Sequence, residues 1–402
     1  MFFLLAISFL AIISTSYAAD ITIGPNTPGG LKQAIATAKS GDTIYMENGV
    51  YSGANNRMIE IDKNISIRGK GKNVVIDGQK KNYMLFTPAW NRDVWGYYKF
   101  SLTLTNLKIT KFKTIYLREE NIIINAGSLT INNCTFSENK IGQLSELITN
   151  QINSTCKITN SIFTKNYLAN GAEGSASAFH VKNGSNLIIS KCKFNNNIGG
   201  GFTIRNGVGR YAGGTVNVTG CSFNNDGRSI LNGNKMVIFK STFKNAQGSP
   251  VSNYGNMKVI DSAFIKNNGG ESGAIYNTGN ITIINSLFKN NKARDSGAIM
   301  NWGIMTIQSS TFTSNIAIGD NKYNKGVAGA IYNYKDYRSP GVLKITNTKF
   351  KNNIAGTTYK AIVAVEFKTI KGKNQMIKGK FTKKNVIITP KDGFVFWNGN
   401  YV

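Results

Sequence analysis

The chain has 402 residues, of which 41% are hydrophobic and 17% charged, which is enough for a large core and excludes a disordered chain or a small disulfide-stapled module. Its 48 Lys and Arg against 20 Asp and Glu give a net charge of +28, which favours anionic partners. One His and four Cys leave little material for a zinc site or a His-based catalytic triad.

The N-terminal segment is predicted to be a secretory signal. Residues 2–13 form an almost unbroken apolar run, and residues 14–19 supply a cleavage site of small side chains. The run is short for a membrane span, so we expect cleavage after Ala18 or Ala19, with an uncleaved anchor as the alternative. A signal peptide over residues 1–19 implies export, and export makes nucleic acid a poor partner despite the positive charge.

The one clear helical pattern follows at residues 31–39. It is predicted to cap the open end of a β-structure, because exposed strand edges would otherwise template aggregation. Short apolar segments at residues 65–67 and 74–76 indicate the first strands. Residues 20–100 are therefore assigned to an N-terminal cap with the first β-coils.

An internal repeat dominates the middle of the chain. Apolar residues (or Cys156) stand seven and five positions before a recurrent Phe, and Ser, Cys or Thr stands two positions before it. In seven of nine rows an Asn follows three positions after the Phe, whereas the other two rows have Asp226 and Ala246. The recurrent residues are Phe136, Phe163, Phe194, Phe223, Phe243, Phe264, Phe288, Phe312 and Phe350.

The spacing within a row predicts two short strands joined by a corner. Positions −7 and −5 share one strand face, and positions −2 and 0 share another, because side chains alternate with period two. The odd interval between −5 and −2 requires a bend, and residues that accept left-handed backbone, such as Asn133 and Asn285, stand at −3 in six rows. Gly-Ala-Ile at 273–275, 297–299 and 329–331 indicates a third strand per coil.

Repeats of this kind predict a solenoid in which equivalent residues of successive coils stack about 4.8 Å apart. Each column of the repeat then becomes a ladder, and stacked Asn side chains hydrogen-bond to one another, which explains the 52 Asn of the chain. We expect about 11–14 coils, with residues 101–367 as the repeat body. Residues 368–402, which begin with seven lysines in 17 residues, are assigned to a basic C-terminal coil or cap.

Two resemblances accompany these patterns. Residues 31–51, with Gly41-Asp42 and Asn48-Gly49, resemble the start of right-handed parallel β-helices of the pectate-lyase type. The alternation of Phe-x-x-Asn with Gly-Ala-Ile resembles the repeat of polymorphic outer-membrane proteins and of archaeal adhesin-like surface proteins. The resemblances imply an all-β, right-handed parallel β-helix (solenoid) with a short N-terminal capping helix, and a role in surface attachment. The motif residues belong to the scaffold, so functional residues must be sought elsewhere.

The cysteines and the histidine have ordinary structural explanations. Cys134, Cys192 and Cys221 occupy the −2 column and Cys156 the −7 column, so all four are predicted to point inward as buried thiols. Cys192 and Cys221 lie in adjacent coils of one column, where a disulfide is the alternative. His180 follows an inward position of a strand and is therefore expected to be exposed.

Acidic residues that could form a catalytic pair are scarce. β-Helix enzymes that act on acidic polysaccharides resemble one another in using clustered Asp, with Ca²⁺ and an Arg base in lyases or paired acids in hydrolases. The best constellation is Glu271 and Asp295, each seven residues after a Phe in neighbouring coils, so we expect them about 5 Å apart, which suits a retaining pair. Because Lys292 and Arg294 stand nearby, a solvated edge is favoured over a catalytic or cation-binding role.

Two loop insertions carry tyrosines flanked by cations, a composition that suits sugar or protein surfaces. Loops on a rigid scaffold commonly carry binding, although ordinary loop decoration is the alternative. The candidate binding residues are Tyr323, Tyr332, Tyr334, Tyr337, Arg338, Arg205, Arg210 and Tyr211.

These patterns together predict a secreted or cell-surface, adhesin-like protein that binds glycans, envelope polymers or partner surfaces without catalysis. The expected partners are an anionic polysaccharide, a cell-envelope polymer or a surface glycoprotein. We expect a monomer with no cofactor, no metal, no nucleic-acid partner and no membrane span after signal cleavage. The alternatives are a polysaccharide lyase or glycoside hydrolase acting on acidic polysaccharide, and a purely structural envelope rod.

Overall fold

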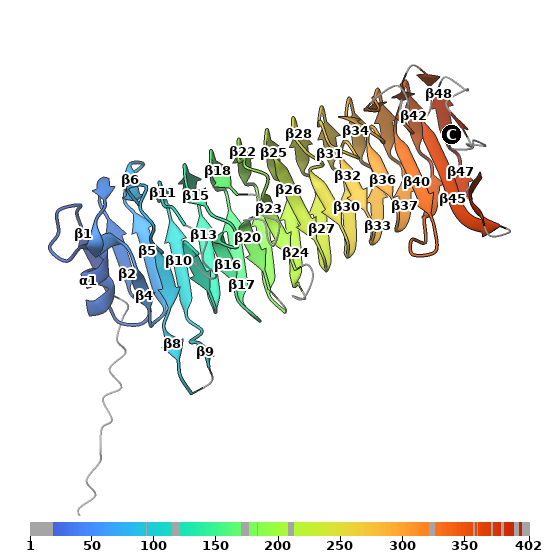
Figure 1. Ribbon diagram of the computed structural model, residues 1–402. Helices are drawn as coiled ribbons and strands as arrows, with labels where there is room; N and C mark the ends of the chain where they lie inside the picture. Colours follow the sequence, from blue (N-terminus) through green and yellow to red (C-terminus); the bar gives the residue numbers. More distant parts are fainter. Residues whose placement is uncertain are drawn as a thin grey trace, which may run out of the picture.

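The computed structural model describes residues 19–93, 95–114, 121–169, 177–182, 184–207, 213–320, 326–356, 358–359, 361–370, 373–378, 382–389 and 394–395. Over these residues the chain winds as a right-handed parallel β-helix whose coils follow one another along a rod (Figure 1). The fold class predicted from the repeat is confirmed. The predicted signal segment, apart from Ala19, lies outside the described residues.

Three long sheets run along the rod. Sheet A, which holds positions −7 and −5 of the repeat, has 14 strands in the described part of the chain: β1 (Asp20–Ile23), β2 (Thr43–Met46), β5 (Ile65–Gly69), β10 (Ser101–Thr105), β13 (Ser128–Asn132), β17 (Thr155–Thr159), β21 (Asn186–Ser190), β24 (Thr215–Thr219), β27 (Lys235–Phe239), β30 (Asn256–Ile260), β33 (Asn280–Ile284), β37 (Ile304–Gln308), β41 (Val342–Thr346) and β47 (Thr382–Lys384).

Sheet B holds the recurrent Phe in strands of three or four residues. Its 13 strands in the described chain are β3 (Gly49–Tyr51), β6 (Val74–Asp77), β11 (Lys108–Thr110), β14 (Thr135–Ser137), β18 (Ile162–Thr164), β22 (Lys193–Asn195), β25 (Ser222–Asn224), β28 (Thr242–Lys244), β31 (Ala263–Ile265), β34 (Leu287–Lys289), β38 (Thr311–Thr313), β42 (Lys349–Lys351) and β48 (Ile387–Thr389).

Sheet C is formed by the third strand of each coil. In order along the rod it comprises β4 (Ile59–Ile61), β7 (Phe86–Pro88), β12 (Ile123–Asn125), β16 (Glu146–Asn150), β20 (Ser177–Val181), β23 (Phe202–Asn206), β26 (Arg228–Asn232), β29 (Val251–Asn253), β32 (Ile275–Asn277), β36 (Ile299–Asn301), β40 (Ile331–Lys335), β45 (Ile362–Ile370) and β46 (Lys373–Lys378), with β49 (Phe394–Val395) beside β45.

Short strands add three small sheets at the corners. They are the pair β15 (Lys140–Ile141) and β19 (Tyr167–Leu168), the row β35 (Lys292–Ala293), β39 (Ile316–Ala317), β43 (Ile354–Ala355) and β44 (Thr358–Tyr359), and the antiparallel hairpin of β8 (Trp90–Asn91) and β9 (Gly96–Tyr97). At the C-terminal end, β45 and β46 also pair antiparallel, whereas β47 and β48 add one more strand to sheets A and B.

The Phe column forms one continuous stack inside the rod. The strands of sheet B pair in register, so that each Phe from Phe136 to Phe350 lies beside the Phe of the next coil. Neighbouring ring centroids are 4.5–5.1 Å apart with ring planes within 13° of parallel, and every ring is at most 1% exposed. The ring spacing therefore follows the strand spacing.

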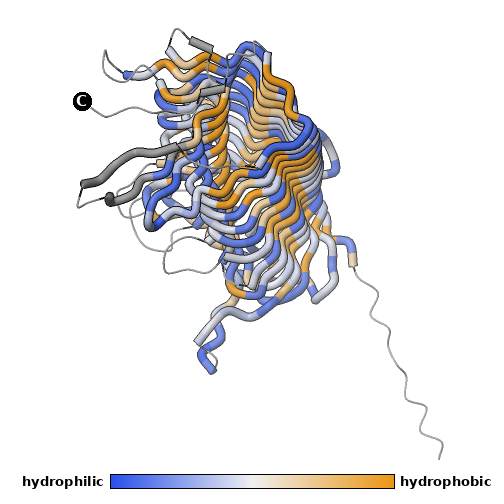
Figure 2. The backbone as a smooth tube through the Cα atoms, turned by 90° about the vertical axis from the view of Figure 1, so that its right-hand side faces the viewer, coloured by the Kyte–Doolittle hydropathy of each residue, from blue (hydrophilic) through white to orange (hydrophobic). Residues whose placement is uncertain are grey.

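Corners of left-handed backbone separate the sheets. The predicted corner residues at −3 adopt positive φ, for example 52° at Asn133 and 46° at Asn285. A second corner, which the repeat did not reveal, lies two residues after each Phe and is occupied by residues as different as Glu138 (φ 57°) and Lys165 (φ 55°). Because the corners recur at equivalent places, apolar residues of successive coils form continuous stripes along the rod (Figure 2).

Asn ladders hold the corners of neighbouring coils together. The side-chain amide of Asn267 donates to Oδ1 of Asn291 at 2.9 Å, and Asn291 donates in the same way to Asn315. The backbone N–H of each residue donates to the same oxygen of the next, at 3.0–3.1 Å. The ladder therefore satisfies backbone and side-chain groups that are fully buried.

Asp226 interrupts this ladder. It is 1% exposed, and its Oδ1 accepts hydrogen bonds from the backbone and side-chain nitrogens of Asn197 at 3.0 and 2.9 Å, while Oδ2 accepts from Thr203 Oγ1 at 2.9 Å. The next coil has Ala246, which offers no side-chain acceptor. Burial raises the pKa of Asp226 to about 7, although the hydrogen bonds oppose this shift.

A short helix covers the N-terminal end, close to the predicted range. Helix α1 (Gly30–Thr37) buries Leu31 and Ile35 against the first coil. The backbone N–H of Leu31 donates to Oδ1 of Asn56 at 3.0 Å, which satisfies a donor at the helix start. Asn56 belongs to the 3₁₀ turn η1 (Ala54–Asn56), so the cap residues are held by the coil that they cover.

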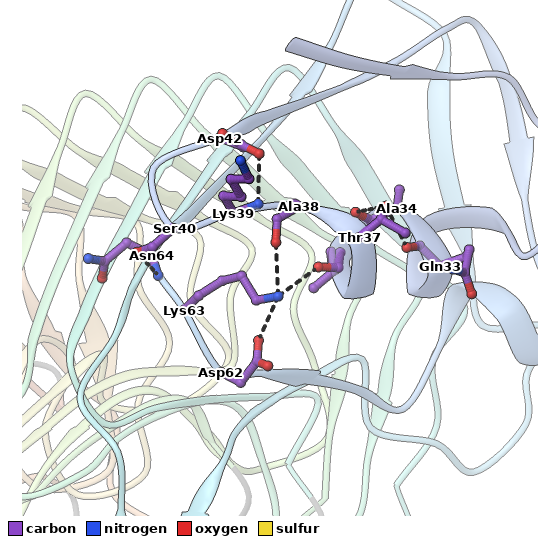
Figure 3. A network of polar contacts seen from close by, with 11 residues as sticks. Gln33, Ala34, Thr37, Ala38, Lys39, Ser40, Asp42, Asp62, Lys63 and Asn64 are labelled. Atoms are coloured by element: carbon purple, nitrogen blue, oxygen red, sulfur yellow. Dashed lines mark hydrogen bonds and ion pairs between the residues drawn. The ribbon is translucent and has the colours of Figure 1, made fainter. Parts of the chain in front are cut away.

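A polar network fastens the other end of α1 (Figure 3). The ammonium group of Lys63 donates to the carbonyl oxygens of Ile35 and Ala38 at 3.2 and 3.0 Å, and it lies 3.4 Å from Asp62 Oδ1. A cation at this place satisfies carbonyls that have no partner within the helix. Asp42 accepts from the backbone N–H groups of Ala19 and Lys39, and these hydrogen bonds lower the pKa of the Asp42 carboxyl.

The four cysteines are free and buried, as their columns predict. Burial raises the pKa of Cys134 to about 12, so this thiol is inert at neutral pH. The alternative of a disulfide between Cys192 and Cys221 does not hold. In the described part of the chain, no helix combines the length and the apolar character that crossing a membrane demands.

Replacing Phe288 by Ala should lower the free energy of unfolding by about 3–5 kcal/mol, because it opens a cavity in the middle of the ring stack. Urea denaturation followed by circular dichroism measures the loss. Thr282→Ala, on the outward side of sheet A, is the matched control and should change stability by less than about 0.5 kcal/mol. Equal losses of unfolding free energy in the two variants would show that the ring stack contributes no more to stability than an outward side chain does.

Replacing Asp226 by Asn should abolish a pH-dependent loss of stability. Since the folded pKa of Asp226 is about 7 and the unfolded one 3.8, the wild type becomes less stable than D226N as the pH rises from 4 to 7, by at most about 4 kcal/mol. Thermal midpoints of the two proteins should converge at pH 4 and differ at pH 8. If the thermal midpoints of the two proteins change with pH in the same way between pH 4 and pH 8, the raised pKa of Asp226 is contradicted.

Candidate functional site

One row of side chains points outward from the middle of sheet C. Their inner neighbours, such as Ile204 and Ile275, are part of the core, and alternation turns the next residue outward. In register along the rod the row contains Thr149, His180, Arg205, Leu231, Ser252, Tyr276, Met300, Tyr332 and Val363. Unlike the inner columns, this row changes chemistry from coil to coil.

A hollow of about 420 Å³ lies in the middle of this face. It is lined by Phe202, Arg228, Tyr254, Glu271 and Tyr276, which come from four successive coils. The Arg228 guanidinium carbon lies 5.5 Å from the ring centroid of Phe202, and the rings of Tyr254 and Tyr276 are 6.4 Å apart. The hollow thus gathers a cation, a carboxylate and two phenols around one open space.

Arg294 joins the two acids that the sequence singled out. Its Nη2 lies 3.5 Å from Glu271 Oε1 and 2.8 Å from Asp295 Oδ2, and its Nε is 3.1 Å from the same Asp295 oxygen. The coils that carry the two acids are neighbours, since Ser272 pairs with Ser296. The side chain of Asp295 is 12% exposed and that of Glu271 51%, and of the two only Glu271 lines the hollow.

The surroundings keep the cation and the phenols protonated. The hydrogen bond with Asp295 raises the pKa of Arg294. Burial, followed by the negative charge of Glu271, raises the pKa of Tyr276 to about 12. Burial also raises the pKa of Tyr254, although the neighbouring Arg228 opposes this. At neutral pH these phenols are therefore proton donors.

An aromatic cluster continues the face toward the C-terminus. The rings of Trp302 and Tyr334 stack with centroids 4.3 Å apart, and Tyr332 stands edge-on to Tyr334 at 6.1 Å. Tyr332 is 8% exposed and packs with Met300 and Val363 in a small apolar cluster outside the main core. Tyr332 and Tyr334 belong to β40, so the predicted loop begins only after this strand.

The remaining predicted binding residues are spread over the surface. Tyr337 is 84% exposed beside β40, with the Arg338 guanidinium 4.8 Å from its ring. Arg205 lies in the outer row of sheet C, next to His180. Tyr323, Arg210 and Tyr211 lie outside the described residues.

His180 is buried rather than exposed, which corrects the sequence prediction. It does point outward from sheet C, but its Nδ1 lies 3.1 Å from Glu146 Oε1, and both side chains are at most 8% exposed. The other oxygen of Glu146 accepts a hydrogen bond from Thr149 Oγ1 at 3.1 Å. Strand alternation predicts the direction of a side chain but not what covers it, and Glu146 is 34 residues away in the sequence.

The Ca²⁺ that the resemblance to acidic-polysaccharide lyases implies has no fitting residues here. Among the residues that the structure describes, no three His, Cys, Asp or Glu side chains come together as ligands. Ca²⁺ takes six to eight oxygen ligands, whereas Glu271 is the one described acid that lines the hollow, and Arg294 contacts both it and Asp295. The described residues around the hollow therefore do not supply the ligand set that Ca²⁺ needs.

Comparison with known proteins yields similarities of fold. No protein-family model and no curated protein matches the chain. Among solved structures, the chain is similar to pectate lyase Pel9A, with 16% identity over 78% of this chain and 79% of that chain and a TM-score of 0.40. It is also similar to a mannuronic-acid-specific polysaccharide family 6 lyase from human gut microbiota, with 12% identity over 93% and 83% of the two chains and a TM-score of 0.46.

A third similar structure is the catalytic unit of a GH87 α-1,3-glucanase from Streptomyces thermodiastaticus strain HF3-3. The identity is 11% over 92% of this chain and 66% of that chain, with a TM-score of 0.47. At such identities a likeness shows the fold alone, and the predicted pectate-lyase-type β-helix agrees with it.

The prediction of a non-catalytic, adhesin-like protein is corrected by this comparison. The similar solved structures named above are two polysaccharide lyases and a glycoside hydrolase. The prediction that the chain is not an enzyme is contradicted by the same finding. The error has a physical origin, because the repeat that suggested an adhesin consists of inward-facing scaffold residues, which do not determine function.

Replacing His180 by Leu should lower the free energy of unfolding by about 1–3 kcal/mol, because the buried carboxylate of Glu146 loses its imidazole partner. Glu146→Gln should cost a similar amount, and the double variant H180L/E146Q should cost less than the sum of the two. Urea denaturation of the wild type, the two single variants and the double variant gives the coupling free energy between His180 and Glu146. Strict additivity would show that the two side chains do not interact.

Proposed function

We propose that the protein is a polysaccharide lyase that cleaves an acidic polysaccharide on the outer face of sheet C. The observation that carries this proposal is the hollow in which Arg228, Glu271 and Tyr276 meet. A cation for the sugar carboxylate, a proton acceptor and a proton donor are the groups that β-elimination of a uronic acid needs.

The reaction uses each of these groups once. The Arg228 guanidinium pairs with the carboxylate of the uronic acid, which makes the proton on C5 more acidic. Glu271 accepts this proton, the electron pair of the broken C5–H bond forms the C4–C5 double bond, and the bond between C4 and the glycosidic oxygen breaks with its electron pair on the oxygen. Tyr276 donates its proton to the departing oxygen, as a phenol with a pKa of about 12 is protonated at neutral pH. Solvent then restores both protonation states.

Elimination is favoured over hydrolysis by the positions of Glu271 and Asp295. A glycoside hydrolase needs a pair of carboxyl groups facing the bond, one of them protonated. Asp295 is nearly buried, contacts two nitrogens of Arg294 and does not line the hollow. Glu271 is then the one acid of the pair that lines the hollow, which suffices for elimination but not for a two-carboxylate hydrolysis.

The surroundings of the hollow suit a polyanion that lies along the rod. The chain carries +28, a charge that draws a polyuronate toward it. Trp302 and Tyr334 provide a stacked aromatic surface two and three coils beyond Tyr254, on which the apolar faces of further sugars can rest. Tyr337 and Arg338 stand at the same end and extend this surface, and the nearly buried Tyr332 packs edge-on against Tyr334.

The organisation of the chain fits an exported enzyme. Residues 1–19 are taken as a signal peptide, so that the protein is secreted or held at the cell surface, where polysaccharides too large for uptake are met. Residues 20–100 form the cap with the first coils, 101–367 the repeat body that carries the site, and 368–402 a basic C-terminal coil. The likeness of the repeat to polymorphic outer-membrane proteins then concerns the scaffold only.

The proposal predicts that the purified protein releases unsaturated uronates from at least one of polygalacturonate, polymannuronate, polyguluronate or polyglucuronate, measured by the ultraviolet absorbance of the new double bond. Tyr276→Phe and Glu271→Gln should each lower kcat about 100-fold or more, because each removes a proton-transfer group. Arg228→Ala should lower kcat/KM at least as much, since the sugar carboxylate is left without its partner.

Thr282→Ala, on the outward side of sheet A, is the matched control and should keep wild-type turnover. Thermal midpoints of all variants verify that the fold is intact. Wild-type protein that yields no unsaturated product from any of the four polymers would refute the proposal. Full turnover by R228A would refute the assigned site.

A further inference from the structure

A hairpin rich in aromatic residues projects from the rod near its N-terminal end. Strands β8 and β9 leave the coil after β7 of sheet C and return before β10 of sheet A, and in Figure 1 they extend beyond the stacked coils. Trp95 at the hairpin tip is 85% exposed, Trp90 49% and Tyr98 43%. Large aromatic rings exposed together on a protein surface mark an interaction site.

The hairpin holds the rings of Trp90, Tyr97 and Tyr98 against neighbouring rings. Trp90 pairs with Tyr97 across the two strands, and their rings meet edge to face with centroids 5.0 Å apart. The backbone N–H of Tyr98 donates to the carbonyl oxygen of Ala89 at 2.9 Å, and the ring of Tyr98 stacks on Phe100 at 5.9 Å. Rings that are ordered before binding lose little conformational entropy when a ligand arrives.

The hairpin forms one wall of a hollow of about 440 Å³. Rings of Trp90, Trp95 and Tyr97 line this wall, and the opposite side is built by Gln151 and Asn153, which follow β16 of a later coil. The volume is within the range of roughly 300–1,000 Å³ that is typical of ligand sites. Residues from three successive coils thus enclose a space with an aromatic side and a side that carries amide groups beside Ala126 and Ile152.

The polar side suits an anionic sugar. Lys99 lines the hollow, and Lys182 is tied to its rim by donating from Nζ to Gln151 Oε1 at 2.9 Å. Amide groups and ammonium groups match the hydroxyl and carboxylate groups of a hexuronate, while the apolar face of a pyranose ring can lie on Trp95.

The location of the hollow connects it to the site at Arg228. Tyr97 and Asn153 lie where sheet C passes into sheet A, and Tyr254 and Trp302 lie at the same corner of later coils. Five strand steps separate β7 from β26, which corresponds to about 24 Å along the rod. A polymer that follows this corner reaches both hollows, whereas a single sugar occupies only one of them.

We propose that the β8–β9 hollow is a second binding site for a segment of an acidic polysaccharide, which holds the polymer while cleavage takes place near Arg228. The inference rests on the proposed function for the identity of the polymer. Two linked contacts on one chain raise the apparent affinity for long chains far more than for short ones.

The test is a titration of the full chain with polygalacturonate, polymannuronate, polyguluronate and polyglucuronate, and with their tetramers, followed by tryptophan fluorescence and by calorimetry. Binding of at least one polymer should alter the tryptophan emission, and Trp95→Ala should weaken its affinity about tenfold or more. Trp95→Phe, which keeps an aromatic ring, should retain part of the affinity. The tip residue is exposed, so its replacement does not threaten the fold.

The two proposals fail in different ways. If R228A and E271Q lose turnover but keep the W95A-sensitive polymer binding, both proposals stand. If the wild type binds a polymer in a W95A-sensitive manner but releases no unsaturated product, the lyase proposal fails and the hairpin site survives. If W95A binds the polymers as tightly as the wild type, or if none of the four polymers binds, the hairpin proposal is overturned. A dimer in sedimentation experiments that W95A abolishes would also overturn it, by making the hairpin a contact between copies.

Discussion

In-register parallel pairing of successive coils is the constraint on which this structure depends. One coil is too small to bury its own inward side chains, so each Phe and each Asn is covered by its equivalent in the next coil. The Phe288 and Phe312 rings lie 4.5 Å apart, and the Asn291 amide donates to Asn315 at 2.9 Å, because the strands above them match residue for residue. A slip of one residue would turn every inward side chain outward.

The same constraint explains where function can lie. Inward positions must repeat from coil to coil, and a residue that departs from its column, such as Asp226, changes pKa because it is buried among neutral partners. Outward positions on sheet C have no such requirement, so Arg205, Tyr276 and Tyr332 can follow one another in a single row. The scaffold therefore sets the spacing between functional groups, about 4.8 Å per coil, and leaves their chemistry to vary.

The candidate site could be predicted only in part from the sequence. Glu271 and Asp295 were recognisable because both stand at one offset from a Phe in regular coils, yet their common contact with Arg294 depends on side-chain conformation. Arg228 and Tyr254 lie in coils without the Gly-Ala-Ile signature, so their register in sheet C could not be counted from it. The prediction of a non-catalytic, adhesin-like protein was wrong because it relied on the repeat, which is built from interior residues that carry no chemistry.

The amino-acid sequence by itself determined the winding of the chain, the inward columns, the corner residues and the capping helix, since these depend on period-two alternation and on contacts between residues a nearly constant distance apart. Only the tertiary structure decided which outward groups share a hollow, that His180 is buried against Glu146, and that the aromatic hairpin faces a later coil. Those contacts join coils through side chains and insertions of irregular length, and no periodicity encodes them.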